Sequence, residues 1–310
     1  MTVRDRGLAV VVAVLWGANF IAIHVGLEHF PPVFLAGLRM LVLAVPAVLL
    51  VPRPQVPLRW LVGYGLGFGT LQFLFLFLGM YAGMPAGLAS LVLQASGPFT
   101  LVLGALLLRE QVRRRQWIGI GVAVAGLATI ALLRAQTAAL LPVALTLLGA
   151  LGWALGNLCN RLAQRDGAAV DPLHLTLWMC VVPPVPLLAM SAVVEGPTTG
   201  WVATAAVFSW DGLPGLAALL YLSVVATVVG SGIWTVLMRR YPAGVVAPHS
   251  LLVPVVGMGL AIVLLGERPS VPELLAGVVV VIGVLAASAP GRRVPDVMRP
   301  DVARSGSSRG

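Results

Sequence analysis

Charged residues are scarce in this chain of 310 residues, where they make up 10% of the sequence against 59% hydrophobic residues. Soluble domains carry about 25% charged residues, so this composition excludes a water-exposed globular domain. Apolar runs such as residues 7–27 and 32–51 also reach the length of about 20 residues that a helix needs to cross a bilayer. The sequence therefore predicts an integral membrane protein.

Cysteine is nearly missing, and motifs of catalysis are missing altogether. The two cysteines, Cys159 and Cys180, fall inside or at the end of apolar segments and offer no disulfide framework. The sequence has no phosphate-binding loop, no HExxH motif and no cluster of His, Cys and acidic residues with metal-ligand spacing. We therefore expect neither a metal ion nor a cofactor, and a self-contained ATP-driven pump is excluded.

Charged residues and prolines divide the chain into ten apolar segments, each of a length that fits a membrane span. The predicted spans are residues 7–27, 32–51, 60–81, 84–108, 117–134, 138–159, 173–194, 212–237, 243–266 and 271–289. Residues 1–6 precede the first span. Residues 291–310 are polar and rich in Gly, Ser, Pro and Arg, which predicts a disordered tail. The expected fold is an all-α integral membrane protein of ten transmembrane helices.

The distribution of arginine predicts how these spans are oriented. Lysine is absent, and 17 of the 20 basic residues lie in segments on the same side as both termini. The opposite loops hold only Arg134 and Arg268. Positive residues accumulate on the cytoplasmic side, so both termini are predicted to be cytoplasmic, in a bacterial inner membrane. The net charge of +9 is then explained by topology, and no nucleic-acid partner is expected.

The two halves of the sequence match at a constant offset of 157 positions. The matched pairs are Tyr64 with Tyr221, Thr70 with Thr227, Pro85 with Pro242, Ala86-Gly87 with Ala243-Gly244, Glu110 with Glu267, and Gly126 with Gly283. Each half, residues 7–134 and 138–290, holds five predicted spans, and an odd number gives the halves opposite orientations. Two such inverted repeats give alternating access a physical basis, because two arrangements of similar energy open one central site to opposite faces. A repeat that serves only the fold is the alternative.

These features resemble one transporter family. Ten spans in a five-plus-five repeat, the segment WGANF (16–20) and the glutamates that close the fourth and ninth spans are similar to EamA-type drug/metabolite transporters. Similarity is greatest to the exporters of O-acetylserine and cysteine, through PPVFLAGLR (31–39), RPQVPL (53–58), GMPAGLASLVLQA (83–95), GNLCN (156–160) and APHSLLVPVVG (247–257). The resemblance implies a secondary transporter that exports a small amino-acid-like metabolite by alternating access.

Arg39 is the most informative single residue, because it lies within the second predicted span. An arginine at bilayer depth costs about 2.5–3.5 kcal/mol even on the lenient insertion scale, so it needs a wet cavity or a partner. One hypothesis is a clamp for a substrate carboxylate, with which guanidinium forms bidentate pairs. The alternatives are an extension to the headgroups, or a structural bond to carbonyls that a helix irregularity frees.

Other polar and aromatic residues within the spans complete the candidate substrate site. They are Asn19, Gln72, Gln94, Trp153, Asn157, Trp234 and His249. Amides would bond an ammonium, hydroxyl or ester group, although interhelical bonds of about 0.6 kcal/mol each are the alternative. The tryptophans would line the cavity or pack against lipid. His249 and His24 are the titratable candidates for carrying a coupling proton, and otherwise have structural roles.

Prolines within the fourth and ninth predicted spans indicate helix breaks. They are Pro98, Pro248 and Pro254. Broken helices at corresponding positions of two repeats point to a binding site, whereas kinks for packing are the alternative.

Two classes of function are therefore compared. The first is export of O-acetylserine, cysteine or a related amino acid, with another amino acid, a purine or an aromatic drug-like compound as alternative solutes. The second is an integral-membrane enzyme or lipid-handling protein. Small-residue spacings such as Gly119/Ala123 and Gly121/Ala125 predict close helix packing, within one chain or in a homodimer.

Overall fold

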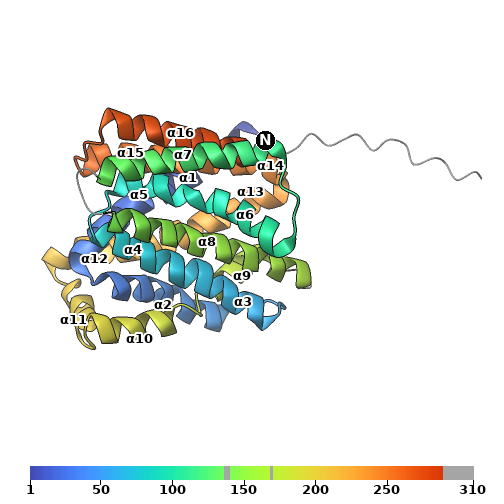
Figure 1. The fold of residues 1–310 in the computed structure, drawn as a ribbon. Coiled ribbons are helices and arrows are strands. Elements are labelled where there is room, and N and C mark those ends of the chain that lie inside the picture. Colours follow the sequence, from blue (N-terminus) through green and yellow to red (C-terminus); the bar gives the residue numbers. More distant parts are fainter. Residues whose placement is uncertain (136–139, 168–169, 289–310) are drawn as a thin grey trace, which may run out of the picture.

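The computed structural model describes residues 1–135, 140–167 and 170–288, and in these ranges all regular structure is helical. The predicted disordered tail, residues 291–310, lies outside the described residues. Figure 1 shows the helices side by side with their axes roughly parallel, α7 and α16 along one edge and α10 and α11 along the opposite edge. The molecule is an all-helical membrane protein.

Within the described ranges, nine segments are long and apolar enough to cross a membrane, and a shorter apolar helix follows them. Four spans are single helices, namely α1 (Val3–His29), α2 (Pro32–Leu50), α7 (Arg114–Ala135) and α8 (Leu141–Asp166). The tenth predicted span is α16 (Val271–Ser288). Its apolar stretch is 17 residues long, so it lies just below the length of an ordinary span.

The other spans are interrupted helices. They are α3 (Leu58–Tyr64), η1 (Gly65–Gln72) and α4 (Phe73–Tyr81); α5 (Ala86–Val92), η2 (Leu93–Ala95) and α6 (Ser96–Leu108); α9 (Pro172–Met179) and α10 (Pro184–Val194); η3 (Trp210–Gly212), α12 (Leu213–Leu220), η4 (Tyr221–Val229) and α13 (Gly230–Arg240); and α14 (Ala243–Val246), η5 (Ala247–Leu251) and α15 (Leu252–Leu264). A further helix that the sequence did not predict, α11 (Thr199–Ala206), lies in the loop after α10.

The 3₁₀ segments η2 and η5 coincide with the predicted proline breaks. Pro98 is the third residue of α6, directly after η2, and Pro248 lies within η5. Pro254 is the third residue of α15. Because proline lacks an N–H and clashes with the preceding turn, it is accommodated in the first turn after such a break.

Two π-helices occupy matching positions in the two halves, and the sequence analysis did not predict them. η1 spans Gly65–Gln72 and η4 spans Tyr221–Val229, which correspond at the offset of 157 positions. The two threonines of the matched pair make equivalent hydrogen bonds, each to the carbonyl five positions earlier in its own π-helix. Thr70 Oγ1 donates to Gly65 O at 3.3 Å, and Thr227 Oγ1 donates to Leu222 O at 2.9 Å. A π-helix disturbs the i→i−4 ladder, and these hydroxyls supply bonds that lipid cannot.

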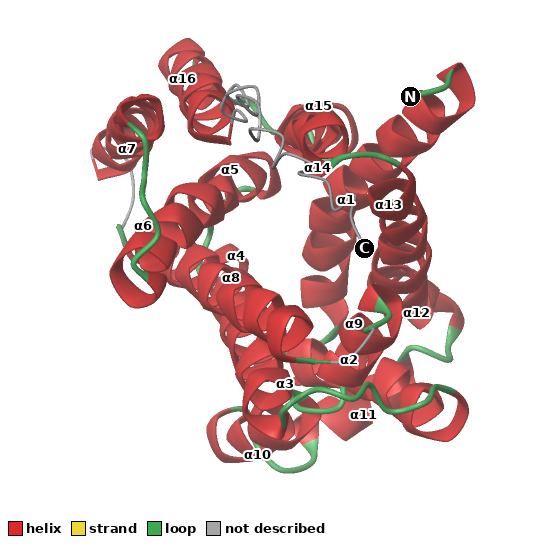
Figure 2. Cartoon of the chain, turned by 90° about the vertical axis from the view of Figure 1, so that its right-hand side faces the viewer, coloured by secondary structure: helices red, strands yellow, loops and turns green. Residues whose placement is uncertain are grey.

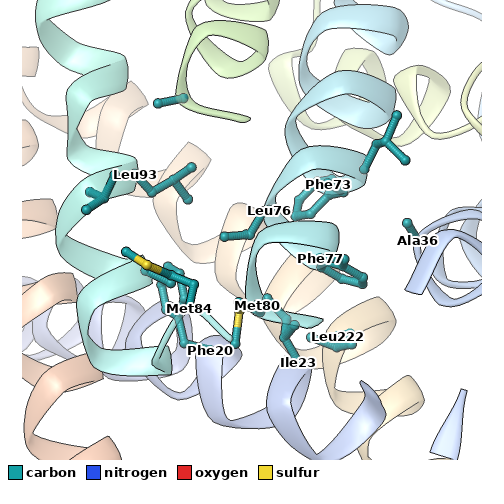
Figure 3. Packing of buried hydrophobic residues seen from close by; sticks show 14 of the residues in the cluster. Phe20, Ile23, Ala36, Phe73, Leu76, Phe77, Met80, Met84, Leu93 and Leu222 are labelled. Carbon is teal, nitrogen blue, oxygen red and sulfur yellow. The ribbon is translucent and has the colours of Figure 1, made fainter. Parts of the chain in front are cut away.

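One large apolar cluster fills the centre of the bundle. Figure 3 shows Phe73 and Phe77 of α4 there, with Ile23 of α1 and Leu222 of η4 nearby. Phe77, Ile23 and Leu222 are completely buried. Side chains from both halves of the sequence therefore share one core, which surrounds Arg39.

Helices α7 and α16 pack backbone to backbone. A Cβ atom on Gly283 would lie 2.3 Å from Ala123 N, and one on Gly119 would lie 2.3 Å from Ala287 N. The predicted Gly119/Ala123 spacing therefore serves contact within one chain. Gly121 has no neighbour within 4 Å of a Cβ position, and Ala125 is exposed, so the Gly121/Ala125 face points away from the bundle. A homodimer through that face stays a prediction.

This packing generates a matched pair of variants. Gly283→Ala places a methyl group against the backbone of α7, and overpacking of this kind costs about 1–3 kcal/mol. We expect it to lower the thermal unfolding temperature in detergent. Gly121→Ala meets open space and gains helix propensity, so its unfolding temperature should be equal to or above that of the wild type. Equal unfolding temperatures for the two variants would contradict the described interface.

Candidate functional site

Arg39 lies inside the bundle with 2% of its surface exposed. Its Nη2 atom donates to Leu222 O at 3.0 Å and to Thr227 Oγ1 at 3.0 Å, both in η4. The guanidinium carbon also stands 4.0 Å from the centre of the Phe73 ring. The charge therefore does not extend to the headgroups. A carbonyl of the π-helix and an aromatic face replace part of its hydration.

The bonds to η4 use only part of the hydrogen-bonding capacity of Arg39. Its Nε and Nη1 atoms are buried and have no hydrogen-bond partner among the described residues. The same is true of Oε1 of Gln72, which ends η1 and precedes Phe73. Native structures leave few buried polar atoms unpaired, and each such atom calls for an explanation, such as a water or a ligand. The structure thus leaves two donors and one acceptor unsatisfied on neighbouring spans.

The position of α2, which carries Arg39, is set at its first turn. Pro31 and Pro32 begin the helix, where proline needs no N–H partner. The carboxylate of Glu195, just after α10, accepts from Val33 N at 2.7 Å and from Phe34 N at 2.9 Å. At the other end of the helix, Trp178 of α9 donates to Val51 O at 3.0 Å. The α2 helix is thus held at both ends by the span formed from α9 and α10.

The remaining amides of the candidate site are spread over several spans. Asn157 of α8 donates to Thr100 Oγ1 of α6 at 3.4 Å, which matches the interhelical alternative. Asn19 of α1 and Gln94 of η2 are half-buried, and their side chains make no hydrogen bond to the described residues. Asn19 and Gln94 therefore remain available to a solute, whereas Asn157 already has a partner.

The aromatic candidates belong to two separate groups. Trp153 of α8 packs edge-on against Phe68 of η1, with ring centres 5.9 Å apart. Trp234 of α13 packs against Trp16 of α1 at 5.3 Å, and Trp16 Nε1 donates to Ala226 O of η4 at 3.0 Å. Each of the two candidate tryptophans thus packs against a residue that belongs to a π-helix or is hydrogen-bonded to one.

His249 lies in η5, half-buried, with Nδ1 3.2 Å from Val246 O. His24 is exposed and lies 3.6 Å from Glu28 on the same helix. Among the described residues, no hydrogen bond, ion pair or ring contact joins any two of the eight predicted site residues. In the same ranges, no group of three His, Cys or acidic side chains is placed to hold a metal ion.

Three helices cross closely near the middle of α1, namely α1, α5 and α15: a Cβ on Gly17 would lie 2.7 Å from Val256 Cγ1, and one on Gly257 would lie 2.9 Å from Ser90 Cβ. Figure 2 views the end where the N-terminus lies, and shows α6 and α8 on one side and α1 and α13 on the other. There α6 packs on α8.

Glutamates occupy both ends, and neither pairs with the arginine beside it in sequence. Glu267 accepts from Ala86 N at 2.6 Å and from Gly87 N at 3.1 Å, at the start of α5. Glu110 forms an ion pair with Arg161 of α8. The offset of 157 positions was the sequence signal that these two glutamates belong together.

The sequence is similar to known transporters over nearly its whole length. The model of the EamA-like transporter family matches residues 7–132 and again residues 140–289. A "Probable amino-acid metabolite efflux pump" of Salmonella typhimurium is 44% identical over 91% of this chain and 94% of its own length. The protein of the same name from Escherichia coli K12 is 41% identical over the same shares. A "Probable terminal-alkyne amino-acid exporter" of Streptantibioticus cattleyicolor is 29% identical over 92% of this chain and 97% of its own length.

A solved crystal structure shares the fold. It matches with a TM-score of 0.59 at 20% identity, and the match covers 93% of this chain and 98% of that chain.

Proposed function

Because this chain belongs to the EamA-like transporter family, we propose that it exports an amino-acid metabolite, with O-acetylserine, cysteine or a close analogue as the substrate. The chain is a membrane transporter and not an enzyme, which removes the membrane-enzyme alternative. The observation that carries the substrate class is the buried Arg39, whose Nε and Nη1 atoms lack partners. The names of the relatives at 41% and 44% identity support the same class.

The chemistry of such a solute fits the available groups. A carboxylate would accept from Nε or Nη1 of Arg39 in a charge-assisted hydrogen bond and would balance its charge. An ammonium or hydroxyl group would donate to amide oxygens such as those of Gln72, Asn19 or Gln94. Trp153 and Trp234 would contact the apolar part of the solute. A purine or an aromatic drug-like cation would leave the charge of Arg39 without a counter-ion.

The mechanism in this proposal is alternating access by two inverted five-helix repeats, residues 7–134 and 138–290. Two matches of one family model, the paired π-helices and the α7–α16 pair support it. Both termini would then be cytoplasmic in a bacterial inner membrane, as the arginine distribution predicts. The end of the bundle with the Arg240–Asp5 and Arg239–Asp171 pairs would face the cytoplasm.

The substrate class is tested by efflux from proteoliposomes. We expect labelled O-acetylserine or cysteine to leave at least about tenfold faster than a labelled purine at equal concentration, which corresponds to about 1.4 kcal/mol. Liposomes with unrelated membrane protein provide the baseline. Preferred efflux of the purine or of an aromatic cation would contradict the proposal.

A second experiment tests Arg39 as the carboxylate clamp. Arg39→Lys keeps the charge but loses the planar fork, so KM should rise. Arg39→Gln should lose about 1.5–3 kcal/mol of binding, or about tenfold or more in KM. Thr227→Val is the matched control, because it removes a partner of Nη2 and leaves the guanidinium intact. Its KM should stay near the wild-type value. A well-inserted Arg39→Gln protein with wild-type KM would give Arg39 a purely structural role.

A third experiment tests the topology. Reporter fusions after Arg115 and after Gly310 should read as cytoplasmic, and a fusion at Glu195 should read as periplasmic. Fusions within the short loops use sandwich insertion, so that downstream spans are retained. A periplasmic C-terminus would refute both the span count and the inverted repeat.

A further inference from the structure

Glu267 joins the two halves of the chain at the end of the bundle away from the N-terminus. It follows α15, yet its two carboxylate oxygens accept the backbone amides of Ala86 and Gly87, which begin α5. The bonds span about half of the sequence, since they link positions 181 and 180 residues apart. These first amides of α5 have no acceptor within the helix, and Glu267 supplies one from outside it.

The helices that Glu267 joins are the ones that seal this end. Gly87 lies under Glu267 and against Met258, because a Cβ on it would be 3.0 Å from Glu267 Oε2 and 3.2 Å from Met258 Cα. One turn further on, Ser90 is 1% exposed and its Oγ lies 3.5 Å from Pro254 O. Glu267 therefore lies at the mouth of the seam between α5 and α15. There it lines a pocket of about 90 Å³ with Gly87, Leu88 and Met258, and one turn deeper the seam is closed at Ser90.

Glu110 is the counterpart of Glu267 at the offset of 157 positions, and it is engaged differently. Glu110 makes no hydrogen bond to the matching amides, those of Ala243 and Gly244. Glu110 instead pairs with Arg161, at the edge of a pocket of about 360 Å³. Leu108, Leu162, Gln164 and Arg165 line the rest of that pocket. The two matched glutamates therefore differ: Glu267 bonds the first amides of a helix in the other half of the chain, and Glu110 does not.

We propose that Glu267 and Glu110 are the gate carboxylates of the transport cycle. In the conformation described here, Glu267 holds the end away from the N-terminus closed, while Arg161 keeps Glu110 from its own target. In the opposite conformation Glu267 releases Ala86 and Gly87, and Glu110 accepts the amides of Ala243 and Gly244. This inference rests on the alternating access proposed above, and it assigns a positioning role to residues that need not touch the solute.

The strengths of the two contacts fit such an exchange. The carboxylate of Glu267 accepts two charge-assisted bonds, which are stronger than neutral ones. The Glu110–Arg161 pair has 41% and 46% of its side-chain surfaces exposed, and exposed pairs of this kind contribute little. Arg161 can therefore release Glu110 at small cost, whereas breaking the Glu267 contact needs a compensating contact at the other end.

The test measures which end is open and needs no substrate. Cys159 and Cys180 are replaced by serine, and Ser90→Cys places a thiol in the closed seam. The rate of labelling by a membrane-impermeant maleimide is then measured in right-side-out vesicles, with inside-out vesicles in parallel to identify the face of entry. Glu267→Gln puts an amide NH₂ opposite a backbone N–H, so we expect labelling at least about fivefold faster, a typical lower limit for a conformational coupling.

Glu195→Gln is the matched control for general loosening. The carboxylate of Glu195 also accepts two backbone amides at the start of a helix, but that helix is α2, which lies away from the seam. The labelling rate of Glu195→Gln should stay near that of the parent chain, which carries only Ser90→Cys and the two cysteine replacements. Two outcomes would overturn the role of Glu267. One is a labelling rate of Glu267→Gln equal to that of the parent chain, and the other is an equal increase of the rate in Glu195→Gln.

The other gate is tested from the opposite end of the molecule. Arg161→Gln should free Glu110, favour the second conformation and raise labelling at Ser90→Cys about twofold, since the pair it removes is weak. In a chain that also carries Glu110→Gln, Arg161→Gln should have no effect, because nothing remains to be freed. A local structural role of Arg161 would not change the reactivity of a thiol at the other end. An Arg161→Gln effect that persists without Glu110, or no effect at all, would overturn the exchange.

Discussion

Hydrocarbon offers no hydrogen bonds, and this constraint decides where each polar group of the chain can lie. Regular helices satisfy their own backbone, so most of each span is apolar and needs no further explanation. Irregular backbone requires other partners, and the structure supplies several of them. Thr70 and Thr227 bond the π-helical carbonyls, and Glu195 and Glu267 accept the first amides of α2 and α5.

The same constraint explains what could be predicted from the sequence. Spans, breaks at prolines and the exceptional Arg39 follow from local composition, because a charge or a proline is conspicuous among apolar residues. The π-helices have no such local signal, since their residues are as apolar as those of their neighbours. The matched threonines Thr70 and Thr227 were the one indication of the π-helices in the sequence. Their meaning can be recognised only after the π-helices are known.

Contacts between distant segments could not be predicted. Arg39 bonds η4 across 183 positions, and Trp16 bonds Ala226 across 210. Spacing along one helix identifies which residues share a face, but not which of ten helices lies opposite. The two halves also differ where the repeat would suggest equality: the described spans of the second half contain no buried arginine. In the proposed function, a central site between such halves would be asymmetric, and it would give a solute with one carboxylate a defined orientation.

The α7–α16 pair has a consequence for the order in which the chain enters the membrane. The apolar part of α16 is 17 residues, and its glycine face fits α7 so closely that lipid would fill the space poorly. During synthesis, however, α7 emerges more than a hundred residues before α16. The small-residue groove of α7 therefore waits for its partner until α16 has been synthesised. The α16 helix then enters beside a helix already in place and closes the bundle from the side. A nascent chain arrested before residue 271 would hold α7 but would leave its glycine face uncovered.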